Sequence, residues 1–288
     1  MFVFPGNSFE VGNPKLRPTT AKNFDIIASI YNNEIGLLTI DGFYKELKDV
    51  MFTTGIYYGS LPDLASNVNI PDSAFMKDRF NYTTRPQDVV NTSLNNPNLG
   101  YIRGIEIGWQ TNFWYLPQPL NSLVLDINYT KSNSNMDYRI FRNVVTTIYD
   151  TLPSGRIQQK TFFSTNDTVF NGRLVQQAND VLNVALGVDY KGFSGRLSFN
   201  MRGNVLNSVG TRPEESSYTG NIYRWDFTLK QELPVDGLSI ALNGINIFHN
   251  GIKSYRKYRV NPNAPITENL VSVLYPPTIF QANLRYSF

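Results

Sequence analysis

The side chains best suited to ligand chemistry lie in a long connection between two predicted strands, at about residues 51–100. These candidates for ligand contact are Tyr57, Tyr58, Arg79, Tyr82 and Arg85. Aromatic rings offer a flat apolar face to sugars or planar chelates, and a guanidinium group binds an anion through paired hydrogen bonds. The same residue types also pack and solvate an ordinary surface loop. Both interpretations stay open, and we treat this connection as a candidate ligand-contact loop.

A second aromatic and basic run occurs at residues 255–259, which read Tyr-Arg-Lys-Tyr-Arg. Clustered cations near a membrane surface attract lipid phosphate groups. The run could therefore contact lipopolysaccharide at the rim of a membrane protein. The alternative interpretation is a strand that continues above the membrane.

Catalytic chemistry has little support in this sequence. The chain has a single histidine, His249, and no cysteine, so thiolate nucleophiles, thiolate metal ligands and disulfides are excluded. The sequence also lacks a glycine-rich phosphate loop and a G-x-S-x-G nucleophile motif. We predict no catalytic, cofactor-binding or metal site, and we expect that the protein is not an enzyme.

The composition points to strands that carry one apolar face. The 288 residues include 19 Phe and 17 Tyr, and only 17% are charged, against roughly 25% in soluble domains. The net charge of +3 is too small to indicate nucleic acid as a partner. No apolar run approaches the roughly 18 residues of a transmembrane helix. The mean hydropathy of −0.27 is compatible with a membrane barrel, because half of each barrel strand faces water.

The C-terminal segment at 278–288 shows the clearest pattern. Phe280, Ala282, Leu284, Tyr286 and Phe288 alternate with polar residues. Successive side chains of a strand point to opposite faces, and about ten such residues cross a bilayer as a tilted strand. A terminal aromatic residue resembles the assembly signal of bacterial outer-membrane barrels. Leu284, Tyr286 and Phe288 are therefore the predicted assembly signal, with the barrel-assembly machinery as the partner.

Eight further segments alternate in the same way, which gives nine predicted strands. They cover residues 22–31, 35–50, 105–113, 123–130, 182–190, 196–202, 223–230 and 238–243. Their connections alternate strictly between short and long. The short ones lie at 32–34, 116–121, 192–194 and 233–237, and the long ones at 51–100, 133–180, 203–221 and 249–277.

This alternation is typical of an antiparallel transmembrane β-barrel with short periplasmic turns and long extracellular loops. A soluble all-β sandwich or barrel is the competing interpretation, because its strands alternate too. Soluble strands average five or six residues, however, and several of these segments reach about ten. We therefore predict an all-β membrane protein.

Several motifs, in order along the chain, resemble the barrel of TonB-dependent outer-membrane receptors. Residues 12–25 resemble the family segment N-P-x-L-K-P-E-x-S-x-N-x-E, with Thr19 where Glu is usual. Residues 103–106 read Arg-Gly-Ile-Glu and resemble the strand start R-G-x-E. Residues 244–250 resemble a strand end of the form x-x-N-L-F-N, and Tyr286-Ser-Phe288 matches the usual finish. The abundant Asn and Tyr look most like Bacteroidota receptors, including SusC-like ones.

The resemblance implies that residues 1–288 supply about the last nine strands of a 22-stranded barrel. The plug domain, the TonB box and the signal peptide of such a receptor are expected to be absent from this chain. The parent receptor would import an oligosaccharide, a peptide or a metal chelate such as a siderophore. Its implied partners are the TonB complex, the barrel-assembly machinery, outer-membrane lipids with lipopolysaccharide, and a surface lipoprotein.

Two alternatives remain open at this point. One is an autonomous small outer-membrane barrel, either a porin or a surface adhesin, which would insert without upstream sequence. The other is a soluble β-rich binding protein, which would purify from the aqueous fraction without detergent.

Overall fold

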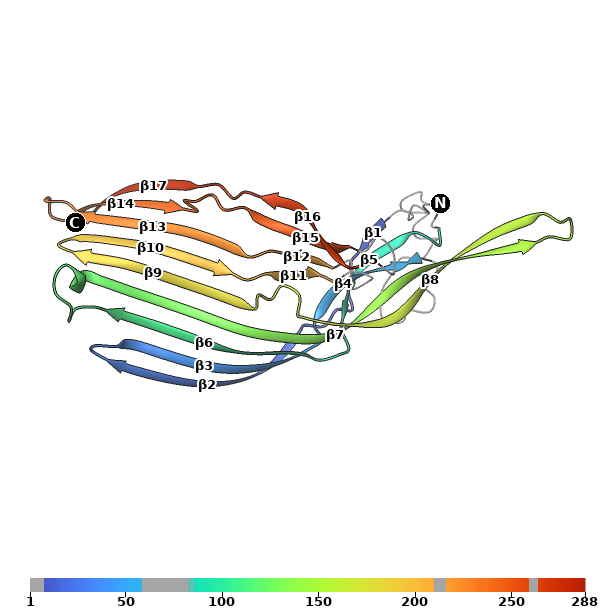
Figure 1. The fold of residues 1–288 in the computed structure, drawn as a ribbon, viewed down its shortest axis with the longest axis horizontal. Helices are drawn as coiled ribbons and strands as arrows, with labels where there is room; N and C mark the ends of the chain where they lie inside the picture. The colour runs from blue at the N-terminus through green and yellow to red at the C-terminus, as the bar shows by residue number, and fades with distance from the viewer. Residues whose placement is uncertain (1–7, 59–82, 84, 210–215, 259–263, 288) are drawn as a thin grey trace.

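A main antiparallel sheet dominates the fold. The computed structural model describes residues 8–58, 83, 85–209, 216–258 and 264–287. Nine strands of this sheet pair with their neighbours in chain order, and they lie side by side (Figure 1). They are β2 (Thr20–Asn32), β3 (Gly36–Lys48), β6 (Gly100–Asn112), β7 (Leu123–Thr151), β9 (Asp180–Tyr190), β10 (Phe193–Arg202), β13 (Ile222–Glu232), β14 (Leu238–Ile245) and β17 (Ile279–Tyr286).

Each of the nine predicted segments overlaps one of these nine strands, so the all-β antiparallel prediction is confirmed. A tenth strand, β8 (Ile157–Gly172), pairs only with the distal part of β7. The sheet is open, because β2 and β17 pair with no further strand in the described part of the chain. Closure into a barrel, and the number of its strands, stay predictions.

The strand register places every predicted apolar face on the same side of the sheet. One cross-strand row runs Ile107, Tyr129, Leu182, Met201 and Tyr223. The next row toward the short turns runs Trp109, Ile127, Val184, Phe199 and Trp225. Much of this apolar face lacks protein cover, with Ile26 82% and Phe280 70% exposed. An apolar surface that spans nine strands marks a contact with another apolar phase.

Short and long connections lie at opposite ends of the sheet (Figure 1). The turn between β9 and β10 consists of Lys191 and Gly192, both with positive φ, as a tight two-residue hairpin turn requires. In the turn from β2 to β3, the Asn32 side-chain oxygen accepts hydrogen bonds from the backbone N–H groups of Glu34 and Ile35. Local turn chemistry therefore defines this end of the sheet.

The long connections are not simple loops, which corrects the sequence expectation. They contain β4 (Met51–Tyr57), β5 (Val89–Asn95), the outer halves of β7 and β8, β11 (Val205–Ser208), β12 (Ser217–Thr219), β15 (Ile252–Tyr258) and β16 (Thr267–Leu274). The strand β1 (Ser8–Val11) pairs parallel with β5, which pairs with β4. A separate sheet has the order β11-β12-β15-β16. Alternate residues of β4 and β5 are buried, and the hydrophobic core of the described residues lies there.

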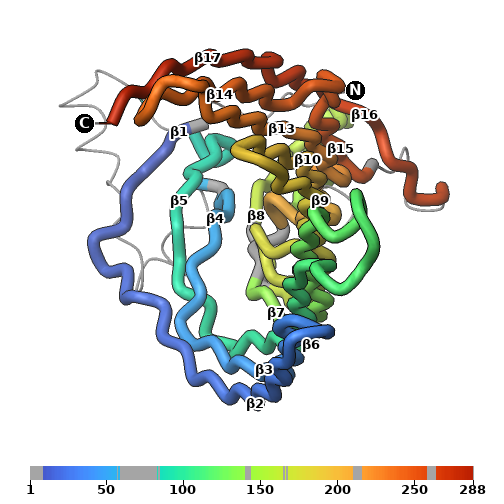
Figure 2. Tube along the Cα trace, turned by 90° about the vertical axis from the view of Figure 1, so that its left-hand side faces the viewer, coloured from blue at the N-terminus to red at the C-terminus, as the bar shows by residue number. Residues whose placement is uncertain are grey.

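The end-on view in Figure 2 shows the main sheet as an open arc from β17 to β2, with β1, β4 and β5 on its concave side. The concave side is the polar face of the sheet. Tyr138 of β7 packs against Phe52 of β4, and by alternation Tyr138 shares its face with Asp126. The short segment η3 (Leu120–Ser122) is a 3-10 helix. Among the described residues, no helix has the length and apolar character to cross a membrane.

Candidate functional site

The concave face of the main sheet forms a polar wall. One of its cross-strand rows runs Gly108, Asn128, Asn183, Asn200 and Arg224, and the next runs Gln110, Asp126, Ala185, Ser198 and Asp226. Charged groups in hydrocarbon are costly, so such rows line water rather than lipid. The register therefore gives the sheet one surface for lipid and one for an aqueous lumen.

Ion pairs and side-chain amides hold the charges of this wall in place. Arg196 binds both carboxylate oxygens of Asp189, at 2.9 and 2.6 Å, in the fork geometry that suits a guanidinium group. Arg224 Nε lies 2.8 Å from Asp226 Oδ2. These exposed pairs contribute about 0–1 kcal/mol each, so their main effect is to hold the charged groups in fixed positions.

Amide groups satisfy two further carboxylates of the wall. Gln110 Nε2 donates to Asp126 Oδ2 at 2.7 Å, and Asn128 Nδ2 donates to Glu106 Oε1 at 2.7 Å. Neutral amides leave the negative charges uncompensated. The wall therefore offers hydrogen-bonding groups of both kinds to a polar ligand that moves along it.

A compact cluster covers the long-connection end of the wall. We call β1, β4, β5 and the adjoining parts of β7 and β8 the mouth assembly. Its core contains Phe52, Ile56, Val90, Leu94, Met136, Tyr138 and Leu174. Ile56 and Tyr138 are fully buried. Burial of this kind is typical of water-soluble protein cores, so the mouth assembly is built to be rigid in water.

Tyr138 connects this core to the chain that follows β8. Its hydroxyl donates to the carbonyl of Arg173 at 2.9 Å and accepts from the backbone N–H of Val175 at 2.8 Å. Burial raises the pKa of Tyr138 to about 12, although the Val175 hydrogen bond acts in the opposite direction. The phenol therefore stays neutral and fixes the segment that carries Arg173.

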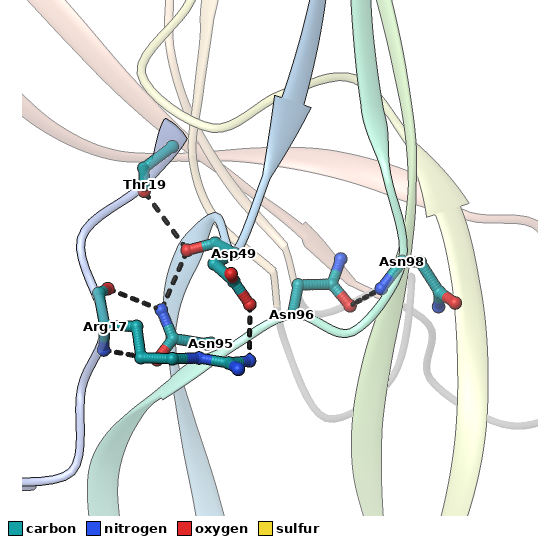
Figure 3. A network of polar contacts seen from close by, with 6 residues as sticks. All are labelled: Arg17, Thr19, Asp49, Asn95, Asn96 and Asn98. Atoms are coloured by element: carbon teal, nitrogen blue, oxygen red, sulfur yellow. Dashed lines mark hydrogen bonds and ion pairs between the residues drawn. The ribbon is translucent and has the colours of Figure 1, made fainter. Parts of the chain in front are cut away.

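The motif at residues 12–25 serves the mouth assembly through the polar contacts in Figure 3. Arg17 forms an ion pair with Asp49 at 2.5 Å, and Thr19 Oγ1 donates to the Asp49 carbonyl at 3.2 Å. Asn95 accepts from the Arg17 backbone N–H and donates to the carbonyls of Arg17 and Asp49, each at 2.8 Å. These contacts attach the segment before β2 to the ends of β3 and β5.

Two further asparagines extend this attachment to β7. Asn96 and Asn98 each donate a side-chain hydrogen bond of 2.9 Å to the carbonyl of Asp137. Asn96 is fully buried, and its Oδ1 accepts from the Asn98 backbone N–H at 3.4 Å (Figure 3). The asparagines therefore replace regular strand pairing where the chain turns from β5 to β6.

The five candidate ligand residues fall in different surroundings. Arg79 and Tyr82 lie outside the described residues, and of Tyr57 the structure describes the backbone at the end of β4. Tyr58 is half-buried and packs against the core of the mouth assembly. The Arg85 backbone N–H donates to buried Asp88 at 2.7 Å, and its guanidinium lies 3.9 Å from the same carboxylate. Their role in ligand contact stays a prediction.

The predicted assembly signal lies on the edge strand β17. Leu284 pairs with Ile240 and Tyr286 pairs with Leu238, so both lie on the apolar face. Leu284 is 70% exposed. Phe288 lies outside the described residues. The role of these three residues in assembly stays a prediction.

A pocket that the sequence did not indicate opens beside the mouth assembly. Its volume is about 540 Å³, and its lining includes Phe170, Arg173, Asn204, Tyr218, Tyr255, Lys257 and Glu268. We call it the mouth pocket. Phe170 pairs with Tyr138 and so shares the concave face. Of the aromatic and basic run at 255–259, residues 255–258 form the end of β15, and Arg259 lies outside the described residues.

The fold thus defines a class of protein: a curved antiparallel sheet of membrane-spanning strands, with an apolar face for lipid, a polar face for water and a folded assembly at one end. Comparison with known protein families identifies the family to which the chain belongs. The family model described as TonB dependent receptor-like, beta-barrel matches residues 3–247, and the chain belongs to this family. It is accordingly a protein of the bacterial outer membrane, from a family of TonB-dependent receptors and transporters. Comparison with curated proteins and with solved structures gave no match.

Proposed function

We propose that this chain forms the wall and mouth of a TonB-dependent importer of a bulky nutrient. The observation that carries the proposal is the continuous polar wall, which leads from the short turns to the mouth assembly on one face of nine strands. Such a wall suits a ligand too polar for the bilayer. The apolar face opposite it suits contact with lipid and, near the rim, with lipopolysaccharide.

The proposed receptor is a 22-stranded barrel to which residues 1–288 contribute the C-terminal part. Within the described residues, β2 and β17 each have one edge without a partner strand, which supports this proposal, because open strand edges in hydrocarbon leave backbone groups without hydrogen bonds. Further strands would pair with both edges, and a plug domain would fill the lumen. The TonB complex would act on that plug, from the periplasmic end where the short turns lie.

The substrate belongs to one of two chemical classes, in this proposal. A SusC-like receptor of the Bacteroidota type would take an oligosaccharide or peptide together with a surface lipoprotein. The other class is a metal chelate such as a siderophore. Tyr57, Tyr58, Arg79, Tyr82 and Arg85 are the proposed contact residues of the first long connection.

Uptake by a strain that lacks the receptor gene, with and without the restored gene, tests the proposal. We expect the restored gene to support uptake of one nutrient class only while TonB is intact. Growth on a purified glycan or peptide would favour the first class, and growth on a ferric chelate would favour the second. Uptake that persists without TonB would contradict the proposal and indicate an autonomous porin.

The proposed assembly signal has its own test. Deletion of Phe288 should lower the amount of receptor in the outer membrane, because the barrel-assembly machinery would lose its terminal aromatic contact. The measurement is immunoblotting of isolated outer membranes, with Ile279→Val at the start of β17 as the control. Unchanged levels after the deletion would refute the role of Phe288.

A further inference from the structure

The mouth pocket combines aromatic rings with an excess of positive charge. Tyr218 of β12 pairs with Tyr255 of β15, and Phe170 of β8 completes the aromatic part of the lining. The ionisable groups of the lining, tyrosines aside, are Arg173, Lys257 and Glu268. Two cations and one anion leave a net charge of +1 at neutral pH. A ligand with a flat ring and an acidic group matches both properties.

Neutral oxygens hold the guanidinium of Arg173 in place. Its Nη1 donates to Asn204 Oδ1 at 2.6 Å, and its Nη2 donates to the carbonyls of Asn204 at 2.7 Å and Gln177 at 3.4 Å. The buried Nε of Arg173 has no hydrogen-bond partner among the described residues. Desolvation by burial lowers the pKa of Arg173. Asp180 acts on it electrostatically and opposes the lowering of its pKa, but Asp180 is held by Lys131 at 2.7 Å. The fold therefore holds this cation by hydrogen bonds to neutral oxygens, which leaves it able to bind an anionic ligand.

Lys257 of β15 supplies the second cation of the pocket lining. Its ammonium lies 4.8 Å from the centre of the Tyr218 ring, and its distance from Glu268 Oε1 is 3.9 Å. The Glu268 side chain is 62% exposed, so this pair is weak in water. A ligand carboxylate can compete with Glu268 for Lys257 without breaking a strong interaction.

We propose that the mouth pocket binds a carboxylate-bearing ring of the imported ligand. The carboxylate lies between Arg173 and Lys257, and the ring packs against Tyr218 and Tyr255. The pocket volume of about 540 Å³ lies in the range for small-molecule sites. This inference rests on the proposed import function and adds the chemical class of the ligand. Two sources carry this chemistry: a uronic acid unit of an oligosaccharide and an aromatic acid of a metal chelate.

Calorimetric titration of the receptor, purified from outer membranes in detergent, tests the proposal. Trigalacturonate and salicylate probe the two sources, and the methyl ester of trigalacturonate and salicylamide are their uncharged counterparts. We expect saturable binding of at least one acid with Kd below about 1 mM, and at least tenfold weaker binding of its uncharged counterpart. The acid that binds identifies the source.

Three variants test how the charged side chains of the pocket contribute to ligand binding. Lys257→Gln should weaken acid binding about tenfold, because a charge-assisted hydrogen bond is lost. Glu268→Gln should strengthen it, about threefold, because it removes the competing carboxylate. Arg256→Gln is the matched control on β15, since Arg256 is exposed and lies outside the pocket lining. It should change Kd by less than about twofold.

Correct folding of each variant is checked by its shifted migration in unheated gels. If neither acid binds, or if Lys257→Gln and Arg256→Gln have equal effects, the proposal is wrong. TonB-dependent uptake that survives in Lys257→Gln, without any acid binding by the parent receptor, would refute the pocket assignment alone. Loss of TonB dependence in the parent strain would instead refute the proposed function.

Discussion

The main sheet and the mouth assembly are stabilised in different ways. In β2 and β17 every described side chain is exposed to the surroundings of the protein. In the mouth assembly β5 alternates half-buried and buried residues, and Tyr138 and Ile56 have no exposed surface. The sheet therefore depends on lipid to cover its apolar face, whereas the mouth assembly carries its own core. Substitutions should therefore affect the two regions independently.

The largest effect is expected from Tyr138→Ala. Removal of a fully buried aromatic ring from a packed core costs about 3–5 kcal/mol. Hydrogen exchange measured by mass spectrometry should show faster exchange in β4, β5 and β8, with β9 and β10 unchanged. Exposed Tyr149, on the outer half of β7, provides the control through Tyr149→Ala. Equal acceleration across the whole sheet would show that the two regions are not independent.

The converse prediction concerns the apolar face of the sheet. Ile107→Lys places a charge in the middle of β6 on the lipid side, at a cost of about 2–4 kcal/mol. The amount of folded receptor in outer membranes should fall, as judged by heat-modifiable migration. Gln110→Lys adds the same charge to the opposite face of the same strand, next to Asp126. Equal losses from both variants would refute the assignment of the two faces.

A smaller effect is expected from the polar attachment at the mouth. Asn95→Ala removes three hydrogen bonds to Arg17 and Asp49, and should cost about 1–2 kcal/mol. Limited proteolysis should then cut more readily near residues 12–19. Ser93→Ala on the same strand removes only an exposed hydroxyl contact with Thr53. An unchanged cleavage pattern in Asn95→Ala would show that these contacts do not hold the segment.

The smallest effect concerns alkaline pH. The pKa of Tyr138 is raised to about 12 in the folded protein, against about 10 when unfolded. The unfolded state therefore loses its proton first, and stability that is complete below pH 10 declines as the pH rises toward 12. The decline reaches about 1 kcal/mol at pH 11, because each unit of pKa difference corresponds to about 1.4 kcal/mol. Mouth stability in Tyr138→Phe should fall less over this interval, measured by hydrogen exchange at β5. Equal declines in the parent protein and in Tyr138→Phe would show that ionisation of Tyr138 is not the cause.

Prediction from the sequence succeeded where structure depends on local pattern. The segment 22–31 lies within β2, and the segment 182–190 lies within β9. Alternation over ten residues is visible without knowledge of any partner strand. It failed for β4 and β5, whose buried residues include Thr54 and Thr92. Polar side chains at inward positions hide the alternation of apolar and polar residues in these two strands. Their burial follows only from the packing of β7 against β4 and β5.

The sequence by itself determined the nine long strands, their two faces and the alternation of short and long connections, because these follow from period-two patterning and turn residues. Only the tertiary structure decided which parts of the long connections meet. Arg173, Asn204 and Lys257 lie far apart in the chain and have no shared motif. They come together because the end of β8 and the sheet of β11, β12 and β15 line one pocket. Contacts of that range leave no periodic trace in the sequence, so the mouth pocket could be found only in the folded chain.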